Sequence, residues 1–314
     1  MNKYIVLILS VLLIACKNDD VALTSVDNDI QAWLDTMNIS AARDDSGIYY
    51  FADSLNPSGD QASNGSVIAI YYTLSDLDGN VIASRLQSSG DSLVFKLGAS
   101  AVYPIGLELA RIMRVGEVYN FIMPPDQAYS GLTSGAINPS LIARMQVQLV
   151  GVFNENDLFA QEIVDIDDYI TANNLNDTIA NPLNMVEKFP ASGIASKRVR
   201  AGVGPLPLNG DTIIINYTGR FLNEVGFGSD SDFQFIFGAN QPRELLSSFE
   251  FGVSRMQTNE EIVLFVPSSQ GYIESALVVP NFIADDLVED GIVPDYVVTV
   301  PPYSTLKFDI TRVD

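Results

Sequence analysis

Apolar residues recur at two different spacings along this chain, and each spacing predicts a different kind of element. Alternating or continuous apolar runs predict strands at residues 48–51, 67–72, 145–149, 212–217 and 306–311. Apolar residues three or four positions apart predict helices at residues 28–37, 107–113 and 163–172, and one ending at Met256. Strands dominate, so we expect an α+β protein in which a short helix covers one face of each twisted antiparallel sheet.

The order of these patterns occurs twice. The first copy runs through Tyr72-Thr73, a turn at Asp78-Gly79, an apolar run ending at Gly98, a helix ending at Met113, and Tyr129. The second runs through Tyr217-Thr218-Gly219, a turn at Asn223-Glu224, an apolar run ending at Gly238, the helix ending at Met256, and Tyr272. The matched tyrosines lie 145 and 143 positions apart. We therefore expect two homologous domains at residues 27–153 and 160–314, each with an N-terminal helix, and a boundary near 154–162.

The N-terminus has the pattern of an export signal. Lys3 precedes an apolar run over residues 4–15, which is shorter than the roughly 20 residues of a transmembrane helix. The residues before Cys16 resemble the lipobox of bacterial lipoproteins, which implies a signal peptide at 1–15 and a lipidated Cys16. The alternative is a plain signal peptide with an incidental cysteine. We expect residues 16–26 to form a disordered tether and the protein to be anchored to the outer membrane, facing the periplasm or the cell surface.

Composition narrows the possible functions. The chain carries 39 acidic and 17 basic residues, a net charge of −22, which argues against nucleic acid as a partner. It contains no histidine, which excludes Ser-His-Asp and Cys-His catalysis and every His-ligated metal site. We expect neither a metal nor a cofactor, and a lipidated Cys16 leaves no cysteine for a disulfide.

Both copies resemble the FKBP-type peptidyl-prolyl isomerase domain, because they keep many of its short motifs in order. The second copy keeps Gly210-Asp211, Tyr217-Thr218-Gly219, Phe233-Gln234-Phe235, Gly271-Tyr272, Val300-Pro301-Pro302 and Leu306-Lys307-Phe308. The first keeps Tyr72-Thr73, Leu97-Gly98, Val115-Gly116-Glu117 and Ala128-Tyr129. The resemblance implies two tandem FKBP-like folds, an isomerase or folding helper outside the cytoplasm, and proline-containing polypeptides as partners.

The same resemblance implies the pocket residues. In the second domain the catalytic set is Tyr217, Phe227, Phe249, Tyr272 and Phe308, with substrate contacts from Phe233, Leu245, Leu246 and Val300. In the first domain the equivalents are Tyr72, Ile82, Tyr103, Tyr129, Ile137 and Met145, which are less aromatic. Aromatic residues at strand spacing are also typical of a core, so only the motif register favours a pocket. Isomerisation needs no ionisable group, because a dry aromatic pocket favours the twisted, less polar amide.

Two departures from the family pattern leave the activity open. The acid that polarises the family's pocket is replaced by Ala83 in the first domain and Gly228 in the second. The second domain also carries an insertion at 273–299, which we expect to be a loop overhanging the pocket, with its acids in solvent. We expect weak isomerase activity, more in the second domain than in the first. The alternative is a catalytically degenerate binding module that presents loops to an exported or surface protein.

Overall fold

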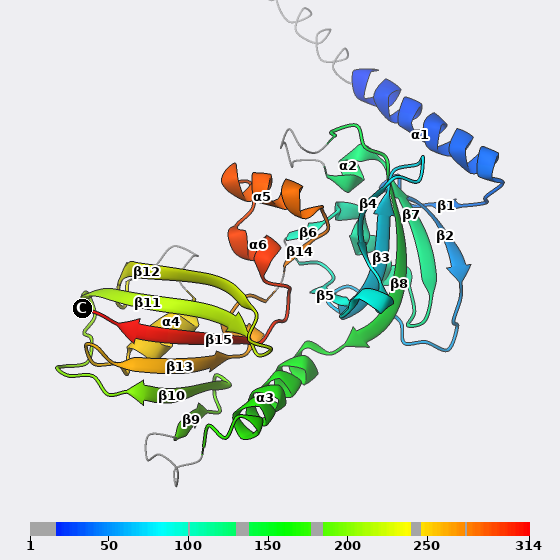
Figure 1. The fold of residues 1–314 in the computed structure, drawn as a ribbon. Helices are drawn as coiled ribbons and strands as arrows, with labels where there is room; N and C mark the ends of the chain where they lie inside the picture. The colour runs from blue at the N-terminus through cyan, green and yellow to red at the C-terminus, as the bar shows by residue number, and fades with distance from the viewer. Residues whose placement is uncertain (1–16, 100, 130–137, 177–184, 240–245, 274) are drawn as a thin grey trace, which may run out of the picture.

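The computed structural model describes residues 17–99, 101–129, 138–176, 185–239, 246–273 and 275–314, which form two α+β domains (Figure 1). Each domain contains one antiparallel sheet, as the sequence predicts. Each sheet has a short helix on one face and an N-terminal helix on the other (Figure 1). Within the described residues, no helix is long and apolar enough to cross a bilayer.

The first domain is built on a seven-stranded sheet in the order β1-β2-β7-β8-β3-β4, with β5 paired to β3. Its strands are β1 (Ala42–Arg43), β2 (Tyr49–Ser54), β3 (Val67–Ser75), β4 (Val81–Arg85), β5 (Leu93–Lys96), β7 (Val118–Met123) and β8 (Ala143–Phe153). The connections contain the short helices η1 (Gln87–Ser89), η2 (Ile105–Ile112) and α2 (Pro125–Ala128). Leu107 and Ala110 of η2 are completely buried against the sheet, so η2 is the helix predicted at 107–113.

The second domain repeats this topology. Its strands are β9 (Val186–Phe189), β10 (Ile194–Arg200), β11 (Thr212–Phe221), β12 (Gly226–Ile236), β13 (Glu261–Val266) and β15 (Leu306–Arg312). They pair in the order β9-β10-β13-β15-β11-β12, which matches the order of the first sheet strand for strand. α4 (Ser247–Val253) takes the place of η2, and η3 (Ser268–Gln270) follows β13. The internal duplication read from the sequence is therefore present in the topology.

The N-terminal helices α1 (Lys17–Met37) and α3 (Glu155–Ala172) pack on equivalent faces of their sheets. Ile30 and Leu34 of α1 are buried against β2 and β7, and Ile166 and Ile170 of α3 are buried against β10 and β13. Each pair is spaced by four residues, which places both side chains on one helix face. This is the spacing that predicted the two helices.

Both helices begin earlier than the sequence analysis expected. α1 starts at Lys17, so the residues 17–26, expected to be a disordered tether, are helical. α3 starts at Glu155, inside the expected boundary, because Asn154 caps it: its side chain accepts a hydrogen bond of 2.9 Å from the backbone N–H of Asn156. Acids in the first turn of a helix also favour its start. The polar residues that break the strand pattern therefore begin a helix that connects the domains.

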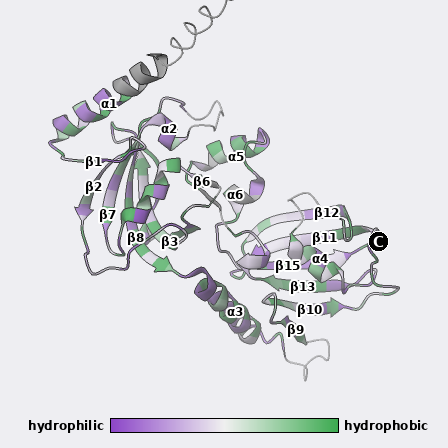
Figure 2. Cartoon of the chain, turned by 180° about the vertical axis from the view of Figure 1, so that it is seen from behind, coloured by the Kyte–Doolittle hydropathy of each residue, from purple (hydrophilic) through white to green (hydrophobic). Residues whose placement is uncertain are grey.

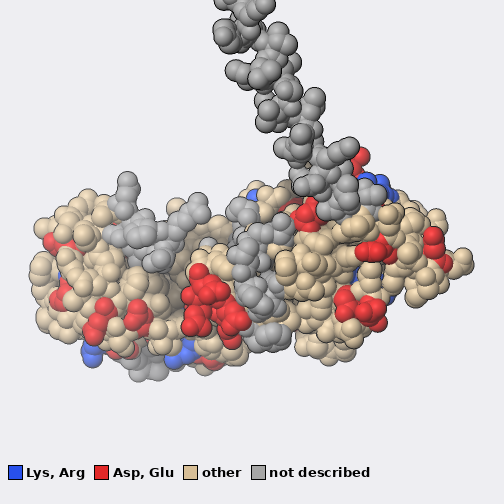
Figure 3. Space-filling model, turned by 90° about the horizontal axis from the view of Figure 1, so that it is seen from above, with Lys and Arg blue, Asp and Glu red and all other residues tan. Residues whose placement is uncertain are grey.

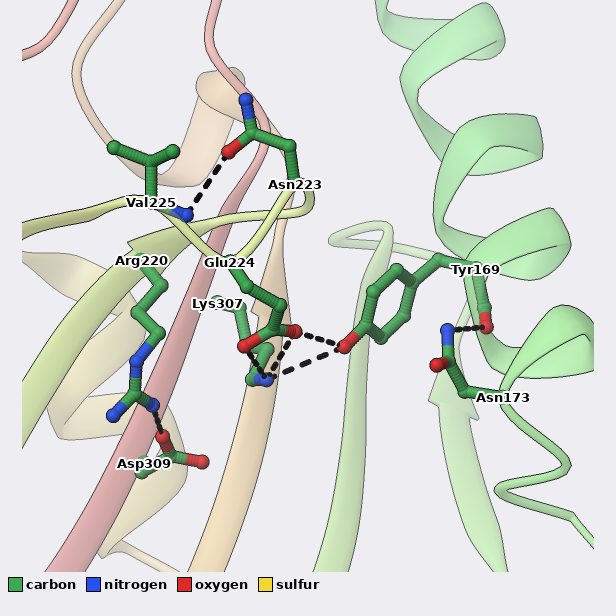
Figure 4. A network of polar contacts seen from close by, with 8 residues as sticks. All are labelled: Tyr169, Asn173, Arg220, Asn223, Glu224, Val225, Lys307 and Asp309. Carbon is green, nitrogen blue, oxygen red and sulfur yellow. Dashed lines mark hydrogen bonds and ion pairs between the residues drawn. The ribbon is translucent and has the colours of Figure 1, made fainter.

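Polar contacts along α3 hold it on the second domain. The buried carboxylate of Glu162 accepts hydrogen bonds of 2.7 Å from the backbone N–H and from the hydroxyl of Ser268. Near the other end of α3, the Tyr169 hydroxyl donates to Glu224, whose two carboxylate oxygens also accept from Lys307 Nζ at 2.7 and 2.8 Å (Figure 4). α3 thus packs as part of the second domain, while Glu155 at its start also forms an ion pair of 2.8 Å with Lys96 of the first domain.

Glu162 gives the second domain a pH dependence that can be measured. Burial raises the pKa of its carboxyl above the ordinary 4.5, against the two hydrogen bonds from Ser268. The folded protein therefore holds the proton to a higher pH than the unfolded chain, and stability falls as the pH rises through this range. We expect the free energy of unfolding of Glu162→Gln to improve relative to the parent as the pH rises above the ordinary carboxyl pKa of 4.5, in urea titrations at a series of pH values. A constant difference, equal to that of the exposed Glu187→Gln control, would contradict this assignment.

The insertion is not the solvated loop that was expected. It contains β14 (Ser275–Leu277), α5 (Asn281–Glu289) and α6 (Asp295–Thr299), which lie between the two sheets (Figure 1). β14 pairs in parallel with β6 (Ala101–Tyr103) of the first domain. α5 is amphipathic: Ile283 and Leu287 are buried. Hydrophobic and hydrophilic residues alternate along its ribbon (Figure 2).

The acids of the insertion do face solvent, as expected. Asp285, Asp286, Glu289 and Asp290 are all exposed on α5 and just after it. Acidic side chains gather in the middle of the face seen from above, on the side where α5 lies (Figure 3). The apolar residues of this segment are therefore the ones that pack against the protein, and its acids are the ones that remain in solvent.

Candidate functional site: an aromatic cavity in the second domain

A cavity of about 650 Å³ lies between the second sheet and the insertion. The domain itself contributes the side chains of Tyr217 (β11), Phe227 (β12), Tyr272, Val300 and Phe308 (β15) to its wall. The insertion contributes the opposite side, from Val288, Ile292, Val293, Pro294, Asp295 and Thr299. The volume is ample for a proline ring and its neighbouring residues, and the wall is mostly apolar.

Aromatic rings in edge-to-face contact make the base of this cavity. The ring of Phe308, which is buried, lies 4.8 Å from that of Phe249 at 83° and 5.6 Å from that of Phe227 at 88°. The ring of Tyr217 lies 4.9 Å from that of Phe249 and 6.2 Å from that of Phe308. Such contacts stabilise rings in fixed orientations. The base is therefore preorganised, and water at its surface meets carbon rather than hydrogen-bonding groups.

Gly219, from the Tyr-Thr-Gly motif, makes this ring packing possible. A Cβ at Gly219 would lie 2.6 Å from the Phe227 ring and 3.0 Å from the Phe308 ring. Its cross-strand partner Gly228 differs, because a Cβ there would meet nothing within 4 Å. Gly219 is therefore required for the two rings to pack as they do. Gly228 instead leaves space at the cavity wall, at the position where the family has an acid.

Two acids stand near the hydroxyl of Tyr217, which lines the cavity. Burial raises the pKa of the Tyr217 hydroxyl, and the negative charges of Asp230 and Asp295 raise it further. Tyr217 therefore stays protonated and can donate a hydrogen bond to a substrate carbonyl. Asp295 comes from α6 and lines the cavity. The insertion thus brings a carboxylate to a pocket that lacks the family's acid at position 228.

The remaining candidates of the second domain lie behind the cavity. Phe233, Leu246 and Phe249 belong to the same hydrophobic core as the cavity residues, but they do not contribute to its wall. Leu245 lies outside the described residues. The insertion was expected to overhang the pocket, and it does line the cavity. Its individual wall residues were not singled out, although the apolar run Ile292-Val293-Pro294 indicated that part of this segment is not exposed.

The candidate pocket residues of the first domain also lie in one hydrophobic core, but side chains of the insertion pack into the same core. Tyr129 and Met145 are buried, and Tyr72, Ile82 and Tyr103 pack against the same core. That core also contains Val278, Ile283, Leu287 and Val293 of the insertion. Ile137 lies outside the described residues. The first pocket is thus occupied by the chain itself.

Comparison with known proteins agrees with the presence of two domains. A family model described as FKBP-type peptidyl-prolyl cis-trans isomerase matches residues 59–150 and 204–312. The chain belongs to this family. It carries two tandem FKBP-type domains, and the family's substrates are polypeptides.

Several solved structures are similar to this FKBP-type chain at low sequence identity. The three FKBP domains of wheat FKBP73 share 15% identity over 88% of this chain and 98% of that chain, with a TM-score of 0.32. FkpA from Escherichia coli shares 17% identity over 42% of this chain and 62% of its own, with a TM-score of 0.35. A peptidyl-prolyl cis-trans isomerase from Pseudomonas syringae shares 17% identity over 42% of this chain and 96% of its own, with a TM-score of 0.34.

Proposed function

We propose that this protein is a lipid-anchored prolyl isomerase outside the cytoplasm and that its second domain holds the activity. The observation that carries the proposal is the cavity of about 650 Å³ based on Phe227 and Phe308, because it offers an apolar surface of the kind that isomerisation needs. The anchor is proposed from Lys3, the apolar run at 4–15 and the lipobox-like residues before Cys16. We propose the outer membrane as the membrane that carries the anchored protein.

The chemistry requires no proton transfer. Rotation about the X-Pro bond is opposed by amide resonance, and the planar amide is the more polar form. The aromatic floor of the cavity removes water from the amide and so destabilises the planar form relative to the twisted one. The Tyr217 hydroxyl holds the substrate by donating to a backbone carbonyl outside the rotating X-Pro amide, whose own carbonyl is left without a donor. The Asp295 carboxylate lines the same cavity, and its negative charge would disfavour the negative charge that the planar amide places on its carbonyl oxygen.

A protease-coupled assay with a proline tetrapeptide tests this function directly on the full mature chain. We expect acceleration of the cis-to-trans step by the parent protein, and an unchanged uncatalysed rate would contradict the proposal. The uncatalysed step takes tens of seconds at 25 °C, so even weak catalysis is measurable.

The contribution of Asp295 can be separated from its neighbours. We expect Asp295→Asn to lower kcat/KM by about three- to tenfold, because the substitution keeps the shape of the side chain and removes its charge. Asp290→Asn, in the exposed acidic turn after α5, is the matched control and should leave kcat/KM unchanged. Equal activity of both variants would show that the pocket works without a carboxylate.

A binding role without catalysis is favoured for the first domain by a specific observation. Its pocket has Ala83 in place of the acid, and its core includes side chains from the insertion. We therefore propose that the first domain retains the fold of the family as a binding module.

A further inference from the structure

The backbone of Val278 is held from both sides by residues of the first domain. Its N–H donates a hydrogen bond of 3.0 Å to the carbonyl oxygen of Tyr103. Its carbonyl oxygen accepts a hydrogen bond from the buried hydroxyl of Tyr129. The preceding residues extend this contact, because Ser275 and Leu277 of β14 pair with Ala101 and Tyr103 of β6 in a parallel register. The segment is therefore bound in the way that an extended peptide adds to a strand.

The side chains of the same segment complete the first domain's core. Val278 is only 1% exposed, and it shares one hydrophobic cluster with Tyr129, Met145 and Leu107. Leu277 and Val279 pack against the same cluster. An extended aliphatic segment is thus the chemical class of ligand that this pocket accepts in the structure. In this pocket the backbone of the segment forms hydrogen bonds, and its apolar side chains are buried.

The docked segment also positions the wall of the other domain's cavity. Val288, Ile292 and Val293 pack with the hydrophobic core of the first domain, and the same three residues line the aromatic cavity of the second. One face of the insertion is therefore fixed by the first domain while another face bounds the second pocket. Release of the segment from the first domain would leave that wall without its support.

We propose that the first domain is a receptor for the chain's own segment 275–279 and that this internal ligand holds α5 and α6 as the outer wall of the second-domain cavity. This role goes beyond the proposed isomerase function, because it concerns the other pocket and requires no catalysis. Tyr103 and Tyr129 act in it as backbone-binding groups. The two domains are thereby coupled through one segment: the first domain binds it, and the helices that follow it form one wall of the second domain's cavity.

Hydrogen–deuterium exchange on the full mature chain tests the proposal without any activity measurement. In the parent protein we expect slow exchange at residues 275–279, because the Val278 amide is bonded to Tyr103. Val278→Asp places a charge in an apolar pocket, so we expect exchange at 275–279 to become faster by about a hundredfold or more. β11 and β15 of the second sheet should keep their protection. Glu289→Gln, on the exposed side of α5, is the control and should exchange like the parent.

A milder variant keeps the test decisive if Val278→Asp disturbs the first domain as a whole. Tyr129→Phe keeps the ring and removes only the hydroxyl that donates to Val278. The lost hydrogen bond leaves a buried carbonyl without a partner, so we expect about tenfold faster exchange at 275–279. The proposal would be overturned if the amides of 275–279 exchanged in the parent as fast as unprotected amides do. It would also be overturned if Tyr129→Phe left their exchange rates unchanged. Neither result would decide whether the second domain is catalytic, because the isomerase assay tests that function separately.

Discussion

Replacement of Gly219 by alanine is expected to lower kcat/KM by more than tenfold, whereas replacement of Gly228 by alanine is expected to change it little. The two glycines are direct cross-strand partners on β11 and β12, and each variant adds one methyl group. Only the methyl at 219 meets other atoms, 2.6 Å from the Phe227 ring and 3.0 Å from the Phe308 ring. Because both rings form the cavity base, they must move away from it.

The magnitude follows from how closely the rings are packed. Insertion of a methyl group into a well-packed site costs about 1–3 kcal/mol, and displaced rings no longer present the same surface to a proline. The measurement is the coupled isomerase assay together with urea unfolding of each variant. Equal activities of Gly219→Ala and Gly228→Ala would show that Phe227 and Phe308 are core residues without a part in catalysis.

Truncation of Phe249 to alanine is expected to have the largest effect on stability. Phe249 is 4% exposed and contacts both Tyr217 and Phe308, so its loss leaves a large hole beneath the cavity. Phe-to-Ala changes at such sites cost about 3–5 kcal/mol, a large part of the stability of one domain. Phe251→Ala on the same helix is the matched control, because Phe251 is only half-buried and should cost less.

The two domains can be followed separately in this experiment. Trp33 is the only tryptophan of the chain and lies in the first domain, where its indole N–H donates to the Leu77 carbonyl at 2.8 Å. We expect the tryptophan fluorescence transition of Phe249→Ala to stay in place while protection of the β11 and β15 amides is lost at lower urea. A shift of the fluorescence transition instead would show that Phe249 stabilises the first domain.

The duplicated fold was predictable because it depends on local patterns. Alternating residues such as those of 212–217 identify strands, and Tyr72 and Tyr217 fix the register of the two copies. The strands and their order agree with this prediction, since each half repeats the same local signals. The cavity base was predictable for the same reason, because Phe227 and Phe308 follow from the motif register. Their role in catalysis remains a prediction that the variants above test.

The insertion was not predictable in this way, because its structure depends on a partner far away in the chain. Val278 is buried only because Tyr103 and Tyr129 lie beside it, and these are separated from it by about half of the sequence. Acids such as Asp285 indicated solvent correctly for one side of α5, but they concealed the apolar side. Asp295 was likewise not singled out as a pocket group, since nothing local connects it with Tyr217.

The most direct test of the account is a residue-resolved NMR titration of the full mature chain with a proline tetrapeptide. We expect the resonances of Tyr217, Phe227, Tyr272 and Phe308 to shift with added peptide and those of Tyr103 and Tyr129 to stay unchanged, because the second pocket is open and the first is filled. Shifts at Tyr103 and Tyr129 with none at Phe227 and Phe308 would contradict the account, because the proline site would then be in the first domain.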